Sequence, residues 1–104
     1  MNADPRASIS RLIVLDTRDT VAVCTADLRE GDTLEDAPEN PLRVLTHVPR
    51  GHKIALRDHD AGQAVIKYGE RIGLAAAAIR RGEHVHVHNL VSARVRRDSQ
   101  TERP

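Results

Sequence analysis

Groups of turn-forming residues recur along this sequence at short intervals, and they limit how long any regular element can be. Between Ile9 and Ala93 each apolar run is short and ends at turn residues such as Gly, Pro, Asp or Asn. Asp36 to Pro41 and Pro49 to His52 are two of these interruptions. Short runs rich in Val and Ile and bounded by turn residues are typical of β-strands. The sequence therefore predicts an all-β domain built from short strands and hairpins.

One segment departs from this pattern by its helix propensity. Leu74 to Ile79 contains four consecutive alanines, the residue with the highest helix propensity. The segment is bracketed by Gly73 and Gly82, and an isolated helix of this length is marginal in water. We expect a strand followed by a tight turn here, or at most one helical turn.

A weak repeat accompanies three of the glycines. Gly31, Gly62 and Gly82 each belong to a unit that consists of a strand, a turn and a second strand. An apolar residue stands three positions before the glycine, except that His59 takes this place in the second unit. Glycine suits such turns because it adopts positive φ without strain. The alternative is that small β domains resemble themselves by chance.

The segment Gly82-Glu83-His84-Val85-His86-Val87-His88-Asn89 places three histidines two residues apart. Successive side chains of a β-strand point to opposite faces, so the three imidazoles line one face and the two valines the other. We expect Val85 and Val87 to pack on the core. A helix does not explain the pattern, because residues two apart on a helix point in different directions. Neutral imidazole is a common metal ligand and general base, so the strand is a candidate site.

The alternative is that these histidines are only exposed surface residues. A set of two or three histidines without a nearby carboxylate or cysteine is also incomplete as a metal site. The missing ligands would have to come from elsewhere in the chain or from another chain.

A second candidate site is the turn Pro49-Arg50-Gly51-His52-Lys53, which precedes a predicted buried strand. Loops held by rigid strands commonly carry reactive side chains. Lys53 is suited to bind a carboxylate, or to act as a base where it is desolvated. If this turn and the histidine strand form one site, the turn should place an atom within about 10 Å of the His86 or His88 ring. The alternative is a solvated turn at the opposite end of the domain.

The composition restricts the classes of function. Tyr68 is the only aromatic residue, so Val, Ile, Leu and Ala must build the core, and such a core favours burial of further surface against a partner. RNA-binding modules stack bases on aromatic rings, which this sequence lacks apart from Tyr68. The net charge of +1 also gives no electrostatic field that would attract nucleic acid or a membrane. Cys24 stands alone, which favours a reducing compartment. With no long apolar run and no signal peptide, we expect a cytoplasmic protein.

The two ends of the chain lack the periodicity of the middle. Residues 1–8 mix polar residues and proline, and residues 94–104 are polar and rich in arginine. We expect a flexible tail at 1–8, one domain at 9–93 and a flexible basic tail at 94–104.

Three segments together resemble the N-terminal domain of the altronate and galactarate dehydratase family, which belongs to the SAF group. They are Gly51 to Leu56, Val65 to Gly73 and Gly82 to Asn89. The resemblance runs from about Asp19 to Asn89, and its Gly-His-Lys and His-Val-His-x-Asn elements are specific to the dehydratase branch. It implies a SAF-type β-clip fold, which is a small, folded-over long hairpin.

The resemblance also implies a function. It suggests a lyase that acts on a hydroxylated carboxylic acid, foremost a sugar acid of the altronate or galactarate type, with divalent iron or manganese as cofactor. Implied catalytic residues are His52, Lys53, His86 and His88, implied substrate contacts are Arg57 and Asn89, and implied metal ligands are His86 and His88. His59 departs from the family, which has an apolar residue at that position.

Family dehydratases carry a large catalytic domain after this one, whereas this sequence ends soon after Asn89. The resemblance therefore implies a small subunit that completes the active site of a separate large catalytic subunit, as in two-subunit lyases such as sulfolactate sulfo-lyase. We expect the isolated chain to be inactive, and it can form a homo-oligomer. Two alternatives remain open at this point: a sulfolactate-cleaving enzyme, and a non-catalytic SAF module for carbohydrate binding or assembly.

Overall fold

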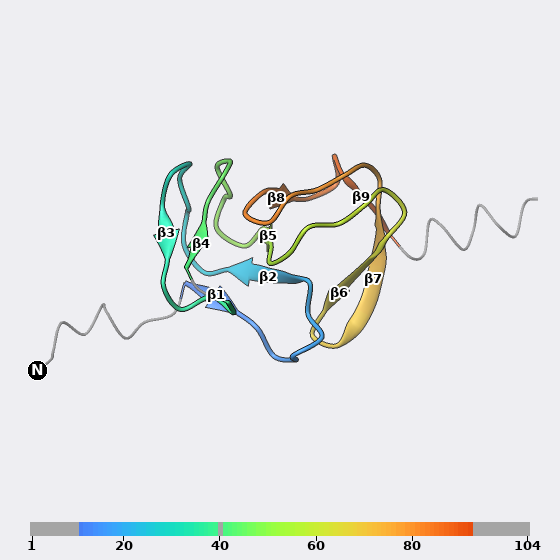
Figure 1. The fold of residues 1–104 in the computed structure, drawn as a ribbon, viewed down its shortest axis with the longest axis horizontal. Coiled ribbons are helices and arrows are strands. Elements are labelled where there is room, and N and C mark those ends of the chain that lie inside the picture. Colours follow the sequence, from blue (N-terminus) through green and yellow to red (C-terminus); the bar gives the residue numbers. More distant parts are fainter. Residues whose placement is uncertain (1–10, 40, 93–104) are drawn as a thin grey trace, which may run out of the picture.

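The structure is a computed structural model that describes residues 11–39 and 41–92. Within these ranges every regular element is a β-strand, which confirms the predicted all-β class (Figure 1). The tails predicted at 1–8 and 94–104 lie outside the described residues. No segment of the two described ranges is a helix that could span a membrane. The strands are β1 (Leu12–Ile13), β2 (Val21–Cys24), β3 (Thr33–Leu34), β4 (Leu42–Arg43), β5 (Lys53–Ala55), β6 (Ala64–Lys67), β7 (Glu70–Ala75), β8 (His84–Val85) and β9 (Leu90–Ser92).

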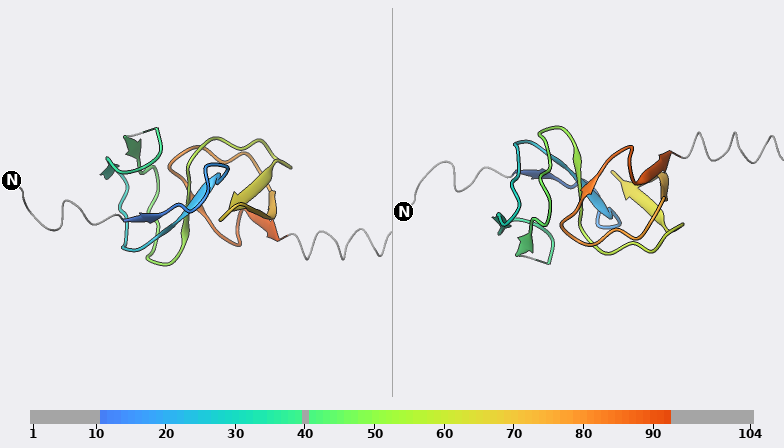
Figure 2. Two further views of the ribbon diagram at one scale, coloured as in Figure 1. Left: turned by 90° about the horizontal axis from the view of Figure 1, so that it is seen from below. Right: turned by 90° about the horizontal axis from the view of Figure 1, so that it is seen from above.

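The strands form three sheets, and all their pairings are antiparallel. The largest sheet has the strand order β1-β2-β5-β8, a second sheet pairs β3 with β4, and the third has the order β6-β7-β9. The four-stranded sheet lies between the other two, which occupy opposite ends of the molecule (Figures 1 and 2). This central position lets the sheet support both ends of the fold.

The central sheet buries apolar side chains on both of its faces. Along β2, Val21 belongs to one core cluster and Ala22 to the other, and along β5 the same alternation separates Ala55 from Ile54. Successive side chains of a strand point to opposite faces, so the sheet divides the interior into two cores. The larger core also contains Leu28, Leu34, Leu42, Val44 and Val48, and the smaller one contains Val65, Ala75, Ile79 and Val85.

The repeat expected from the sequence is confirmed, and it has a fourth unit around Gly51. Its glycines, at positions 31, 51, 62 and 82, have φ angles of 95°, 86°, 86° and 96°. The residue three positions before each glycine is buried and bridges its counterpart in another unit: Leu28 pairs with Val48, and His59 pairs with Ile79. The sequence did not reveal the fourth unit, because a charged residue, Arg43, stands where the other units have an apolar one.

The four units are joined two by two through their glycine amides. In the first half, Gly31 N–H donates to Val44 O and Gly51 N–H donates to Cys24 O, both at 2.8 Å. In the second half, Gly62 donates in the same way to Ala75 at 2.7 Å and Gly82 to Ala55 at 2.8 Å. The molecule therefore consists of two similar halves. The second turn of each half leads into a strand of the central sheet, β5 or β8.

The alanine-rich segment forms a strand and a turn, as expected. β7 ends at Ala75, and the chain then bends before Ile79 forms its bridge. The sequence did not predict β9, which pairs with β7 so that Gly73 lies opposite Ser92. A side chain at Gly73 would collide with the carbonyl oxygen of Val91, so the close approach of these strands requires glycine.

Candidate functional site

The histidine segment is a two-residue strand followed by a turn. β8 ends at Val85, after which His86 N–H donates to Asn89 Oδ1 at 2.9 Å and Asn89 N–H donates to His86 O at 3.0 Å. Asparagine side chains offer the backbone such an alternative to sheet pairing. Val85 is fully buried, as predicted, but the prediction that Val87 packs on the core is wrong, because the turn leaves Val87 82% exposed.

Strand pairing brings the two predicted segments together. β5 pairs antiparallel with β8, and Lys53 lies opposite Val85. The next residues outward, His52 and His86, therefore meet beyond the end of the ladder, and their ring centroids are 3.9 Å apart. This confirms that the Gly-His-Lys turn and the histidine segment lie close together, and it excludes a location at opposite ends of the domain.

Four imidazoles form one group, which we call the histidine cluster: His52, His84, His86 and His88. His52 Nδ1 lies 2.8 Å from His84 Nε2, a hydrogen bond when one of these nitrogens carries a proton. The ring centroids of His84 and His86 are 5.6 Å apart. His88 is exposed and tilts against His84 at a centroid distance of 5.1 Å. The cluster is thus half buried at His52, His84 and His86 and open to solvent at His88.

His47 is a neighbour of the cluster that the sequence analysis missed. The hydroxyl of Thr46 accepts a hydrogen bond from the backbone N–H of His84 at 3.0 Å, which holds this loop beside β8. The charge of His47 is among the causes that lower the pKa of His84. The sequence offers one sign of this position: His47 directly precedes Val48, which is the bridging residue of the fourth repeat unit, around Gly51.

Two imidazoles of the cluster, those of His84 and His86, are favoured in the neutral form. Burial lowers the pKa of His84 from 6.5 to about 4, and repulsion from the neighbouring histidines adds to this effect. Burial also lowers the pKa of His86, and His52, Lys53 and His88 contribute further. His86 Nδ1 is buried and has no hydrogen-bond partner among the residues described. Neutral rings present lone pairs at neutral pH, so the cluster is suited to bind a cation or to accept a proton.

Lys53 lies at the edge of the cluster in a half-buried position. Burial lowers the pKa of its ammonium group, and Lys67 lowers it further by repulsion. The charge of Lys53 in turn lowers the pKa of His86. The ammonium group of Lys53 therefore lies near enough to the imidazoles to act on them electrostatically. The catalytic role of Lys53 stays a prediction.

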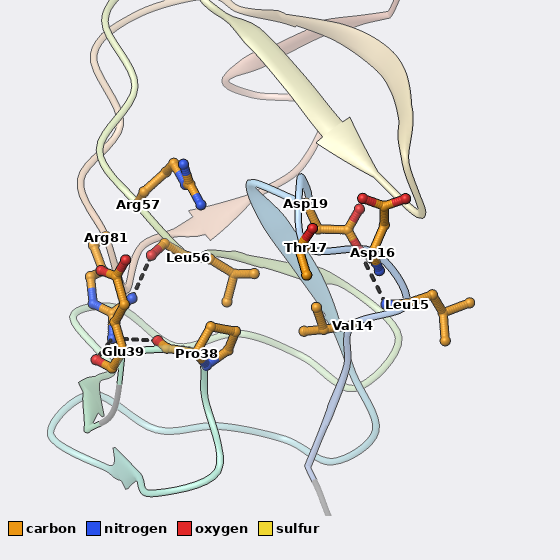
Figure 3. A pocket seen from close by; sticks show the side chains of 10 residues that line it. All are labelled: Val14, Leu15, Asp16, Thr17, Asp19, Pro38, Glu39, Leu56, Arg57 and Arg81. Atoms are coloured by element: carbon orange, nitrogen blue, oxygen red, sulfur yellow. Dashed lines mark hydrogen bonds between the residues drawn. The ribbon is translucent and has the colours of Figure 1, made fainter.

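The two predicted substrate contacts have different surroundings. The Asn89 amide holds the histidine turn, because its Nδ2 also donates to the carbonyl oxygen of His84 at 2.9 Å. Arg57 lines a separate cleft together with Thr17, Pro38 and Leu56, and no histidine lines that cleft (Figure 3). Substrate binding by Asn89 and Arg57 stays a prediction, and Arg57 has no described contact with the histidine cluster.

His52, His84 and His86 are placed to share a metal ion. One nitrogen of each ring lies within 4.8 Å of the other two. Bonds of about 2.1 Å place two ligands of one ion roughly 3 to 4 Å apart, so small ring rotations suffice for joint ligation. The unpartnered Nδ1 of His86 fits the same role. The sequence had singled out His86 and His88, whereas the geometry groups His86 with His52 and His84.

Comparison with known proteins identifies relatives with lyase names. The chain is 49% identical over 71 residues to altronate dehydratase of Escherichia coli K12, which covers 68% of this chain and 14% of the enzyme. It is 47% identical over 53 residues to (2R)-sulfolactate sulfo-lyase subunit alpha of Chromohalobacter salexigens, which covers 51% of this chain and 56% of that subunit. Galactarate dehydratase (L-threo-forming) of Escherichia coli K12 is 41% identical over 69 residues, 64% of this chain and 12% of the enzyme.

The chain thus spans a small part of the dehydratases and about half of the sulfo-lyase subunit. A family model described as the altronate/galactarate dehydratase SAF domain matches residues 10–93. The match includes all four residues of the histidine cluster and every strand described above. The chain belongs to the altronate/galactarate dehydratase SAF domain family.

Proposed function

We propose that this chain is the small subunit of a lyase for a hydroxylated carboxylic acid, and that a separate large subunit completes the active site. The observation that carries the proposal is the grouping of His52, His84 and His86 around one point. No carboxylate belongs to this group in the described part of the chain. A site of three imidazoles leaves positions open for acidic ligands and substrate contacts from elsewhere, and a large partner subunit can supply them.

The reaction class sets what these residues have to do. Elimination removes a proton next to a carboxylate and expels water or sulfite from the neighbouring carbon. His84, with a pKa of about 4, is a weak proton acceptor and is better suited to donate its lone pair to a metal. His88 is the exposed ring of the cluster and has room to exchange protons with solvent or substrate. We assign proton transfer to His88 and orientation of the substrate carboxylate to Lys53.

The three imidazole nitrogens that could bind a metal ion favour some metals over others. Imidazole nitrogen suits Fe²⁺ and other later transition metals, whereas Mn²⁺ prefers oxygen ligands. Of iron and manganese, three imidazoles favour iron. His52, His84 and His86 would hold the ion, and a bound divalent ion stabilises an enolate and a leaving hydroxyl group.

Two substrate classes follow from the relatives. A sugar acid is our first choice, because the family model and the relatives that cover most of this chain carry dehydratase names. Sulfolactate is the second, because the aligned segment makes up 56% and 79% of two sulfo-lyase alpha subunits. A non-catalytic SAF module gives no reason for four imidazoles to gather at one place.

Purification from the native host tests the proposal. A large lyase subunit should co-purify with the full chain, and mass spectrometry identifies it. The complex with Fe²⁺ should turn over altronate, galactarate or sulfolactate, while the isolated chain should not. His86→Ala should reduce this activity by about 100-fold or more.

Arg50→Ala is the matched control, because Arg50 is an exposed residue of the turn that carries His52. It should leave turnover unchanged. Robust turnover by the isolated chain, or full activity of the complex with His86→Ala, contradicts the proposal.

A further inference from the structure

A cavity lies apart from the histidine cluster. Its volume is about 380 Å³, which lies near the lower end of the range of ligand pockets, roughly 300 to 1,000 Å³. Pro38, Leu56 and Arg57 form one wall, and Val14, Thr17 and Asp19 lie on the opposite side (Figure 3). We call this cavity the arginine cleft. Its size fits a small organic molecule.

Both walls of the arginine cleft are fixed by hydrogen bonds. The guanidinium group of Arg81 donates to the carbonyl oxygens of Leu56, Pro38 and Glu39, which ties the loop before β4 to the end of β5. On the other side, the buried carboxylate of Asp19 accepts hydrogen bonds from the backbone N–H groups of Leu15, Asp16 and Gly69. The cleft is therefore preformed, as small-molecule sites usually are.

Arg57 supplies a cation that has no partner among the described residues. Its side chain is exposed and extends along the cleft, and its guanidinium group makes no ion pair or hydrogen bond within the described ranges (Figure 3). The carboxylates across the cleft are already compensated, because Asp16 pairs with Arg18 at 2.9 Å and Asp19 binds backbone amides. Leu56, which lies between Arg57 and these carboxylates, is buried and provides the apolar surface of the cleft. The Arg57 cation therefore lies beside an apolar wall, and Glu39 and Arg81 complete the charged part of the described lining.

We propose that the arginine cleft binds a small organic monocarboxylate. The carboxylate accepts two parallel hydrogen bonds from the Arg57 guanidinium group, which is the geometry this pair prefers. The hydrocarbon part packs on Val14, Pro38 and Leu56. A second anionic group on the ligand would find no further unengaged cation in the described lining, because Arg81 already donates to backbone carbonyl oxygens, so the cleft discriminates against dicarboxylates. The site is separate from the histidine cluster and does not depend on the lyase function.

NMR titration of the ¹⁵N-labelled full chain tests this site. Hexanoate should cause saturable chemical-shift changes at the amides of Thr17, Leu56 and Arg57. Hexanol, which lacks the charge, and adipate, which carries a second carboxylate, should each bind more weakly. Arg57→Met should weaken hexanoate binding by about tenfold or more, because it removes both charge-assisted hydrogen bonds and one alone is worth about tenfold.

Arg80→Met is the matched control, since Arg80 is an exposed arginine that does not line the cleft. It should leave the affinity for hexanoate unchanged. The proposal is overturned if hexanoate gives no saturable shifts up to about 10 mM, or if Arg57→Met binds it as the wild type does. Equal binding of acetate and hexanoate also overturns it, because the apolar wall would then contribute nothing. The histidine variants used to test the lyase function leave this result unaffected, so the two proposals fail separately.

Discussion

His59 is a polar side chain at a buried position of the fold. It occupies the bridging position that Leu28, Val48 and Ile79 fill in the other repeat units, and it is 1% exposed. Neither ring nitrogen has a hydrogen-bond partner among the described residues. Burial lowers the pKa of His59 and the charge of Arg57 adds to this effect, although the carboxylate of Asp58 favours the charged form. An unpaired polar ring at this buried position costs stability.

We predict that His59→Leu raises the free energy of unfolding by about 1 to 3 kcal/mol at neutral pH, the cost of an unpaired buried polar group. In the folded protein the pKa of His59 lies below its ordinary value of 6.5. The wild type therefore has its full stability above that pH and loses stability as the pH falls below it. His59→Leu should lose less on acidification, and His84 accounts for part of the remaining slope because its pKa is also lowered. Urea unfolding between about pH 8 and about pH 5 measures this difference; parallel loss in both proteins contradicts it.

At the scale of the element, the short length of β8 decides which side chains are buried. Alternation along His84 to His88 predicts a longer strand, but the pattern alone does not show where pairing ends. The side chain of Asn89 provides the hydrogen bonds that end it. Val85 therefore faces the core and Val87 faces solvent.

The two valines should respond in opposite ways to the same substitution. Val85→Asp should unfold the chain, because it buries an unpaired charge in the smaller core. Val87→Asp should change the free energy of unfolding by no more than about 0.5 kcal/mol, as is usual at exposed positions. Circular dichroism and thermal melts distinguish the variants. Unfolding of Val87→Asp would contradict this and would support the prediction from the sequence, in which Val87 packs on the core.

The Asn89 side chain should act on the histidine cluster through the backbone. Asn89→Ala removes its hydrogen bonds to His86 N–H and His84 O, each worth about 1 kcal/mol. We expect a looser turn and weaker binding of Fe²⁺ or Co²⁺ to the chain, by roughly three- to thirtyfold. Asn89→Asp keeps the acceptor for His86 N–H and should recover part of the affinity. Metal titration measures both, and equal affinity of Asn89→Ala and the wild type would refute this role.

Local signals in the sequence were sufficient for the fold class and for part of the site. The glycines of the repeat, the short strands and the closeness of His52 to His86 were all predicted and are confirmed. The composition of the cluster was not predictable, because the register of β5 against β8 decides which rings meet. That register depends on packing between residues far apart in the chain, and it places His84 rather than His88 beside His52.

At the scale of the whole molecule, the two similar halves meet in the central sheet. The turn at Gly51 precedes β5, and the turn at Gly82 precedes β8, so the second turn of each half brings histidines to adjacent strands. One half alone carries only part of the cluster. The cluster is thus a product of the assembled fold, and its open side, at His88, is available to a partner.

The charge balance of the cluster gives a last prediction about that partner. Three neutral imidazoles leave the charge of a divalent ion uncompensated, whereas carboxylates from a large subunit would neutralise it. We therefore expect Fe²⁺ to bind the isolated chain at least about tenfold more weakly than the complex. Anaerobic calorimetric titration of both measures this difference. His84→Ala should abolish binding to the isolated chain, while His59→Leu, which changes no residue of the cluster, should preserve it. Affinity that neither the partner nor His84→Ala changes would place the metal outside the histidine cluster.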